Sequence, residues 1–172
     1  MSGPGPTADE LRDTVDEVVV RGLIAAYADV VNRRDWAELD DLFLPDAPVV
    51  LDLRSGAPRR CTGPREIGDF IAGAIERFPF FEFVALNVRV ALRVEGDPDR
   101  ATVRTWMCEL RQDHAGMPSR AFGVYQDVVV RDPSRARHWR FAERHYQSVA
   151  RGEGSLDLLP PPEISGTFPG AP

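Results

Sequence analysis

The spacing of apolar residues changes once along this chain, and that change limits the fold more than any other feature. From Asp9 to Val31 apolar side chains recur every three or four residues, which is the spacing of an amphipathic helix. From Phe80 onward they alternate with polar side chains, which is typical of strands with one buried face. Helices followed by strands joined through turns predict an α+β fold.

Turn and cap residues set the boundaries of the other elements. Asp35 is expected to cap a second helix that ends at Phe43, before Pro45, and Pro64 suits the first turn of a third helix. A short strand is expected over Val49–Leu53. Four long strands are predicted over Val84–Val94, Ala101–Arg111, Ala121–Arg131 and Arg137–Val149.

The length of 172 residues fits one domain with a substantial core. Both ends are rich in Pro and Gly and poor in large apolar side chains. We therefore expect a disordered N-terminal tail over residues 1–8, one domain over 9–151, and a Pro-rich C-terminal tail over 152–172.

The net charge limits which binding partners are expected, and the cysteines indicate the cellular compartment. A net charge of −6 disfavours nucleic acid and anionic membranes as partners, and no apolar run is long enough to span a bilayer. All 21 basic residues are arginine, which leaves no lysine for a Schiff base. No apolar signal segment precedes Cys61 and Cys108, so we predict two free thiols and a cytoplasmic location.

Four segments together resemble a known family. They are LIAAYADVVNRRDWAELDDLF at Leu23–Phe43, CTGPREIGDF at Cys61–Phe70, GVYQDVVVRD from Gly123 and WRFAERHYQS from Trp139. In this order and spacing, over roughly Asp16 to Arg151, the chain resembles SnoaL-like proteins of the nuclear-transport-factor-2-like superfamily. The resemblance implies a cone-shaped α+β barrel, in which the N-terminal helices pack in a curved antiparallel sheet and a small molecule usually lies at the mouth.

The alternation of the strands decides which side chains face the interior of this cone. Matching the family pattern places one set inside, namely Ala101, Val103, Thr105, Met107, Glu109, Gly123, Tyr125, Asp127, Val129, Trp139, Phe141, Glu143, His145 and Gln147. An apolar set is then left outside, namely Trp106, Cys108, Leu110, Phe122, Val124, Val128 and Val130. Because monomers rarely expose such a patch, we predict a homodimer through the outer sheet face. Periodicity alone also allows the inverted assignment.

His145, Asp127 and Tyr125 are the candidate catalytic residues. Imidazole titrates near neutrality, and a neighbouring Asp127 would orient it for proton abstraction beside a carbonyl, while Tyr125 or Asn32 stabilises the developing oxyanion. The competing interpretation is structural. His145 would then form a pair with Asp127 or Glu143, and an arginine such as Arg144 would neutralise Asp127.

The remaining interior positions are candidates for substrate contact. They are Tyr27, Asn32, Trp36, Leu53, Phe83, Thr105, Met107, Glu109 and Glu143. Structural alternatives exist for three of them: Tyr27 has the spacing of a core residue, Asn32 suits a helix C-cap, and Trp36 suits a contact between the first two helices.

The resemblance also indicates which reaction mechanism is not expected in this chain. Scytalone-dehydratase-like members use a Tyr and an Asp at the end of the first helix with two sheet histidines, and the matching positions here are Val31, Asn32, Phe83 and Thr105. That mechanism is therefore not expected. No two histidines lie at a ligand spacing, and no glycine-rich phosphate loop is present. We expect no metal and no cofactor.

The leading hypothesis is a SnoaL-like isomerase, cyclase or lyase that acts by acid-base chemistry on an apolar, carbonyl-bearing metabolite. A role in secondary metabolism, on polyketides for example, is implied by the resemblance alone. The first alternative is a non-catalytic ligand-binding or dimerisation module of the same fold. The second is a supporting subunit that resembles the small subunit of ring-hydroxylating dioxygenases.

Overall fold

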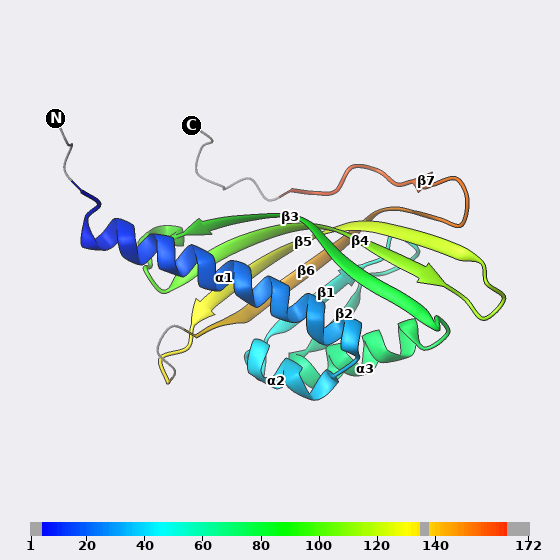
Figure 1. The fold of residues 1–172 in the computed structure, drawn as a ribbon, viewed down its shortest axis with the longest axis horizontal. Coiled ribbons are helices and arrows are strands. Elements are labelled where there is room, and N and C mark those ends of the chain that lie inside the picture. Colours follow the sequence, from blue (N-terminus) through cyan, green and yellow to red (C-terminus); the bar gives the residue numbers. More distant parts are fainter. Residues whose placement is uncertain (1–4, 135–137, 165–172) are drawn as a thin grey trace.

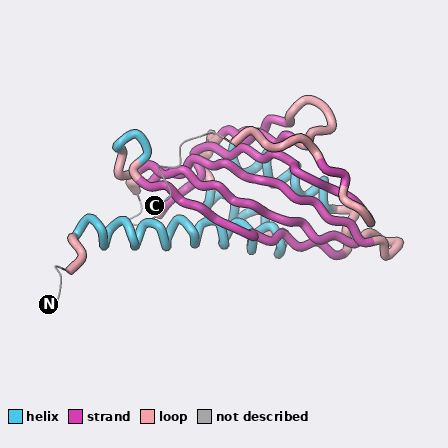
Figure 2. Tube along the Cα trace, turned by 90° about the horizontal axis from the view of Figure 1, so that it is seen from above, coloured by secondary structure: helices cyan, strands magenta, loops and turns pink. Residues whose placement is uncertain are grey.

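A computed structural model describes residues 5–134 and 138–164. Three helices pack on one side of a curved seven-stranded sheet (Figure 1). This arrangement confirms the α+β prediction. Viewed from above, the long first helix runs along the strands (Figure 2). Among the described helices, none is both long and apolar enough for a membrane span.

Helix α1 (Ala8–Arg33) is long because its ends are well capped. At its start the Thr7 side chain accepts a hydrogen bond from the Glu10 backbone, and the Glu10 carboxylate accepts one in return from the Thr7 N–H. At its end Arg34 adopts the left-handed conformation and donates back to Val30 and Val31. The predicted helix is confirmed and extends one residue beyond the expected start and two beyond the expected end.

The expected second helix is shorter and less regular than predicted. A 3₁₀ turn, η1 (Trp36–Glu38), leads into a single helical turn, α2 (Leu39–Leu42). The third helix, α3 (Gly63–Ile75), begins with Pro64 in its first turn, as expected. A Cβ at Gly63, whose φ is +72°, would lie 2.1 Å from the Pro45 carbonyl oxygen, so this tight entry into α3 requires glycine.

The strands are β1 (Pro48–Asp52), β2 (Arg59–Thr62), β3 (Phe80–Leu92), β4 (Arg100–Gln112), β5 (Pro118–Arg131), β6 (Trp139–Gly152) and β7 (Asp157–Leu158). A further 3₁₀ turn, η2 (Val94–Gly96), joins β3 to β4. The sheet order is β2-β1-β6-β5-β4-β3, and β7 pairs with β6. The sheet is antiparallel as predicted except at one pairing, where β1 lies parallel to β6, so the sheet is mixed. The sequence prediction missed β2 and β7, and Arg137, the expected start of the last long strand, lies outside the described residues.

Two extra residues in β6 change which side of the strand faces inward. Val129 pairs with Phe141 but Val128 pairs with Glu143, so Ala142 forms a β-bulge. A second register shift lies where Phe122 pairs with Ala150 and Gly123 with Ser148. A bulge reverses the alternation of the side chains that follow it.

The inward set predicted for β4 and β5 is confirmed, but the set for β6 is wrong beyond Phe141. After the first bulge Arg144, Tyr146 and Ser148 are buried on the inner face. Glu143, His145 and Gln147 lie on the outer face opposite Val128, Gln126 and Val124. A sequence pattern with period two cannot show where an extra residue is inserted.

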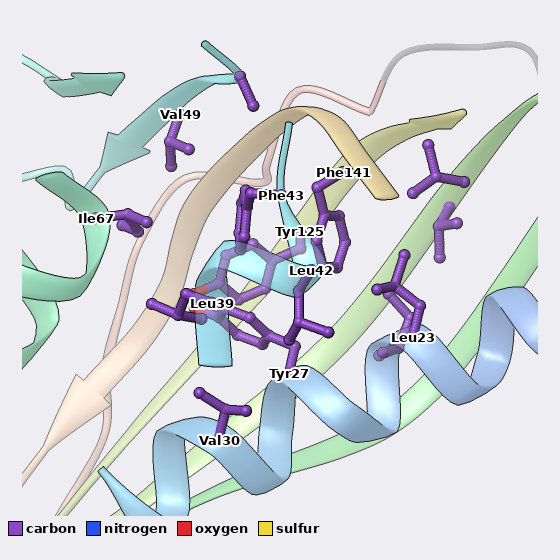
Figure 3. Packing of buried hydrophobic residues seen from close by; sticks show 14 of the residues in the cluster. Leu23, Tyr27, Val30, Leu39, Leu42, Phe43, Val49, Ile67, Tyr125 and Phe141 are labelled. Atoms are coloured by element: carbon purple, nitrogen blue, oxygen red, sulfur yellow. The ribbon is translucent and has the colours of Figure 1, made fainter. Parts of the chain in front are cut away.

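The deep part of the cone is filled by aromatic rings (Figure 3). Tyr27 of α1 makes edge-to-face contacts with Phe43, Phe83, Tyr125 and Phe141, at centroid distances of 5.6 to 6.2 Å. All five rings are at most 6% exposed. Such rings contribute both buried area and oriented contacts, so they hold α1, β3, β5 and β6 together.

A buried ion pair lies within this aromatic core. Nε of Arg144 is 3.4 Å from Oδ1 of Asp127, and both side chains are almost fully buried. The guanidinium carbon lies 3.8 Å from the ring centroid of Tyr27 and 3.9 Å from that of Tyr125. The contact with these ring faces offsets part of the cost of burying the cation. Arg144 thus lies beside Asp127, as the structural interpretation expected.

The C-terminal segment returns over the outer face of the sheet (Figure 1). The Leu159 N–H donates to the Val149 carbonyl, and further along the segment Gln126 Nε2 donates to the Glu163 carbonyl. Val124, on the same outer face, is fully buried within this one chain. Residues 152–164, the described part of the expected C-terminal tail, thus include β7 and contact the domain.

Stability should depend on the protonation of Asp127. Burial raises the pKa of Asp127 to about 7, although Arg144 acts to lower it. The folded state then binds this proton more tightly than the unfolded chain, whose carboxyl titrates near pH 4. We expect the free energy of unfolding to fall by a few kcal/mol between about pH 4 and pH 7 and to level off above, since one unit of pKa corresponds to about 1.4 kcal/mol.

Urea unfolding across this pH range measures the effect, with Asp127→Asn as the reference protein. The difference in stability between the two proteins should shrink or reverse as the pH rises. A difference that stays constant from pH 4 to pH 8 would show that Asp127 does not change its protonation there.

Candidate functional site

A pocket of about 210 Å³ opens above the filled part of the cone. Helix α3 and the residues that follow it form one wall, and the inner faces of β4, β5 and β6 form the other. Tyr125 belongs both to the aromatic core and to this pocket, so its ring separates the two. The site therefore rests on the packed interior and does not extend into it.

The wall beside α3 is apolar. Phe70, Ile71, Ile75 and Phe78 line it, and Leu51 adds to it from β1. This wall exists because α3 is amphipathic and turns its apolar side toward the sheet. It suits the hydrocarbon body of a small ligand.

The opposite wall carries hydroxyl and carboxylate groups. The rings of Tyr125 and Tyr146 lie 4.9 Å apart, and Ser148 and Glu109 stand beside them. Burial raises the pKa of Tyr146 to about 12 and raises the pKa of Tyr125 well above its usual value. Both phenols therefore keep their protons at neutral pH and act as hydrogen-bond donors.

Glu109 is the carboxylate of this pocket. It accepts a charge-assisted hydrogen bond from Arg111, two residues along β4. Its side chain is 18% exposed, which leaves it accessible from the pocket. The carboxylate is thus held in position by Arg111 while it faces the two tyrosines.

Arginines surround the mouth of the pocket. Arg77 follows α3, and Arg111 and Arg151 are the next-to-last residues of β4 and β6. Arg77 and Arg111 lie over the ring of Phe78, at 4.7 and 5.4 Å from its centroid. A shallower neighbouring hollow shares these three residues and adds Arg120.

Of the predicted site residues, Tyr125, Glu109 and Leu53 lie at this pocket. Their roles there remain predictions. His145 is misplaced in the sequence prediction, because the bulge at Ala142 turns it to the outer face opposite Gln126. It does not lie beside Asp127, so the proposed His145–Asp127 dyad is wrong.

The structure places the other predicted residues away from the pocket. Asp127 is enclosed with Arg144, and four further candidates are buried in the core, namely Tyr27, Phe83, Thr105 and Met107. Asn32 uses its side-chain amide to bond the backbone of Phe83, with Oδ1 accepting at 2.6 Å and Nδ2 donating at 3.0 Å. Trp36 packs at the edge of the core, and Glu143 is exposed on the outer face.

Sequence reasoning missed Tyr146, Ser148 and Arg151. All three follow the first bulge in β6, and the segment ERHYQS carries polar or aromatic residues in both alternations. Arg77 and Arg111 were missed because they lie at the ends of elements, where side-chain direction depends on the neighbouring turn. One signal was available: Gly123 interrupts a strand, which often marks the close approach of another group.

Gly123 makes room for Tyr146. A Cβ at residue 123 would lie 2.1 Å from a ring carbon of Tyr146 and 2.5 Å from its hydroxyl oxygen. The ring therefore lies directly over the glycine backbone. The Tyr146 hydroxyl can occupy this position in the pocket only because residue 123 has no side chain.

Among the described residues no group of three or more His, Cys, Asp or Glu could hold a metal ion. The polar side-chain groups at the pocket are one carboxylate, three guanidinium groups and hydroxyls. Such a set suits acid-base chemistry and hydrogen bonding to an organic ligand.

Gly123→Ala should displace the Tyr146 ring, and we expect a loss of about 1–3 kcal/mol in unfolding free energy from overpacking. The matched control is Gly73→Ala in α3, where a Cβ would meet nothing within 4 Å. Thermal unfolding of both variants checks this, with a large drop in Tm expected for the first alone. Equal Tm values for Gly123→Ala and the unmodified protein would contradict the packing described.

Comparison with known proteins places the fold in a family. The family model of the SnoaL-like domain matches residues 12–145. A candidate scytalone dehydratase from Novosphingobium aromaticivorans is 16% identical, with a TM-score of 0.71 over 90% of this chain and 97% of that one. A hexachlorocyclohexane dehydrochlorinase, LinA-type3, from Novosphingobium barchaimii is 14% identical, with a TM-score of 0.65 over 91% and 99%.

A protein from N. aromaticivorans described as nuclear-transport-factor-2-like with a cystatin-like fold is 22% identical. Its TM-score is 0.65, over 86% of this chain and 89% of that one. No curated protein sequence matches this chain. At these identities the solved structures support the fold alone, whereas the family model covers most of the sequence, and the chain therefore belongs to the SnoaL-like family.

Proposed function

We propose that this protein is a cofactor-independent isomerase, cyclase or lyase that acts on a small, apolar, carbonyl-bearing molecule. The observation that carries the proposal is the convergence of Glu109, Tyr125 and Tyr146 on one pocket whose opposite wall is apolar. A carboxylate facing protonated hydroxyls is the minimum set for moving a proton beside a carbonyl.

In the proposed reaction Glu109 takes a proton from the carbon next to the carbonyl. The electrons of that C–H bond form the C=C bond of an enolate, and the negative charge moves to the carbonyl oxygen. Tyr125 or Tyr146 donates a hydrogen bond to this oxygen. If the substrate has a C=C bond between its β and γ carbons, return of the proton from Glu109 to the γ carbon of the dienolate gives isomerisation, and if it has a leaving group on its β carbon, loss of that group gives elimination.

A second candidate is a non-catalytic ligand-binding module. The observation in its favour is that Glu109 already pairs with Arg111, and that the deep interior is filled by rings and by the Asp127–Arg144 pair. The two candidates predict the same pocket and differ in whether a proton moves there.

Proton exchange at a ketone distinguishes them. Phenylacetone places an aromatic ring next to an acidic C–H, and exchange of its benzylic protons in D₂O is followed by NMR. We expect the protein to accelerate exchange, Glu109→Gln to lower the rate by about 10²-fold or more, and Tyr146→Phe to lower it by about 10²-fold.

Glu82→Gln is the matched control, because Glu82 is an exposed carboxylate of β3 away from the pocket. The Glu82→Gln variant should accelerate exchange of the phenylacetone protons as much as the unmodified protein does. If phenylacetone binds but its exchange is no faster than in buffer, the binding-module candidate is favoured. Full activity of folded Glu109→Gln would remove Glu109 from the mechanism.

We propose further that the protein is a homodimer through the outer sheet face, in the cytoplasm. Five apolar side chains there are only half-buried, namely Trp106, Leu110, Phe122, Val128 and Val130. The C-terminal segment covers part of the same face, so the dimer contact would use what remains.

Cys61 and Cys108 are buried and free, which supports a reducing compartment. A role in secondary metabolism rests on family membership alone.

Val128→Arg should yield monomers, because a charge at the contact opposes the burial of apolar area worth about 25 cal/mol per Å². Leu11→Arg is the control, since Leu11 is also exposed but lies on α1. Sedimentation at micromolar concentration measures both. An unmodified protein that sediments as a monomer would contradict the proposed dimer, as would dissociation caused by Leu11→Arg alone.

A further inference from the structure

The charge around the pocket is opposite to that of the protein as a whole. The chain has a net charge of −6, yet the residues that line the pocket include three arginines and one carboxylate. Since Glu109 is paired with Arg111, the charges of Arg77 and Arg151 remain uncompensated within the lining. A local excess of positive charge in a partly apolar hollow attracts anions.

These arginines differ from two arginines of the first helix. On α1, Arg21 pairs with Glu17 at 2.8 Å and Arg33 with Glu38 at 2.7 Å. Within the described residues neither Arg77 nor Arg151 forms an ion pair, and the described partner of the Arg77 guanidinium is the Phe78 ring. Asp157 lies opposite Arg151 in the β6–β7 pairing, and Glu153 and Asp157 line the neighbouring hollow, yet within the described residues neither carboxylate forms an ion pair with Arg77 or Arg151.

The positive charge reaches the hydroxyl wall. Arg111 and Arg151 both act to lower the pKa of Tyr146, against the larger effect of burial. The buried Nε of Arg111 has no hydrogen-bond partner in the described structure. An anionic group at the mouth would therefore meet guanidinium donors while the attached carbonyl lies near the tyrosines.

We propose that the ligand of this pocket is a small organic carboxylate. Its apolar body lies against Phe70, Ile71 and Phe78, and Arg77 and Arg151 bind its carboxylate at the mouth. Guanidinium groups suit this role because their fixed N–H geometry matches a carboxylate. The inference rests on the proposed function for the position of the carbonyl, but carboxylate binding is testable without turnover.

The test compares phenylpyruvate with phenylacetone, in which a methyl group replaces the carboxylate on the same skeleton. Calorimetry or ligand-observed NMR gives both dissociation constants. We expect phenylpyruvate to bind roughly tenfold more tightly or better, with a preference that weakens as salt is added. Arg77→Gln and Arg151→Gln should each reduce the affinity for phenylpyruvate several-fold and leave that for phenylacetone unchanged.

Arg65→Gln is the matched control, because Arg65 is an exposed arginine of α3 that does not line the pocket. Equal affinity for the two probes, no binding of phenylpyruvate at millimolar concentration, or equal losses in Arg65→Gln and Arg77→Gln would each overturn the inference. If phenylpyruvate is preferred but neither probe exchanges protons faster than in buffer, the carboxylate site stands and the proposed catalysis fails. If the protein accelerates proton exchange but does not prefer phenylpyruvate, the proposed catalysis stands and the carboxylate site fails.

Discussion

The bulge at Ala142 is the constraint on which the interior of this protein depends. One extra residue in β6 turns Arg144 and Tyr146 inward and His145 outward. A bulge inserts a single residue, yet it moves all the side chains that follow to the opposite face of the strand. The second register shift, near Val149, brings Arg151 to the same inner face. The chemistry of the pocket is thus set by backbone irregularity as much as by residue type.

The inward turn of Arg144 divides the cone into two regions. Its guanidinium lies between the faces of Tyr27 and Tyr125 and beside Asp127, which closes the deep end with a charged but enclosed layer. Removing either partner of such a pair leaves an uncompensated charge, so the layer resists substitution. Ligand space is therefore confined to the outer region, where Tyr125 forms the floor.

Much of the fold was predictable because periodicity is read over many residues. The first helix and the four long strands follow from spacing alone, and the inward faces of β4 and β5 follow from spacing combined with the family pattern. Individual insertions are not visible in that pattern, which is why His145 was placed inside and Tyr146 was overlooked. The parallel pairing of β1 with β6 was also hidden, since it depends on how a five-residue strand returns across the molecule.

The close fit between Gly123 and Tyr146 has a consequence for the history of this pocket. One position supplies the space that the other fills, so the two form a single volume shared between neighbouring strands. A descendant that acquires a side chain at residue 123 must first lose or shrink the ring at residue 146. The two substitutions can therefore occur in one order only. Loss of the Tyr146 ring comes first and widens the pocket, and a side chain at residue 123 can then occupy the space.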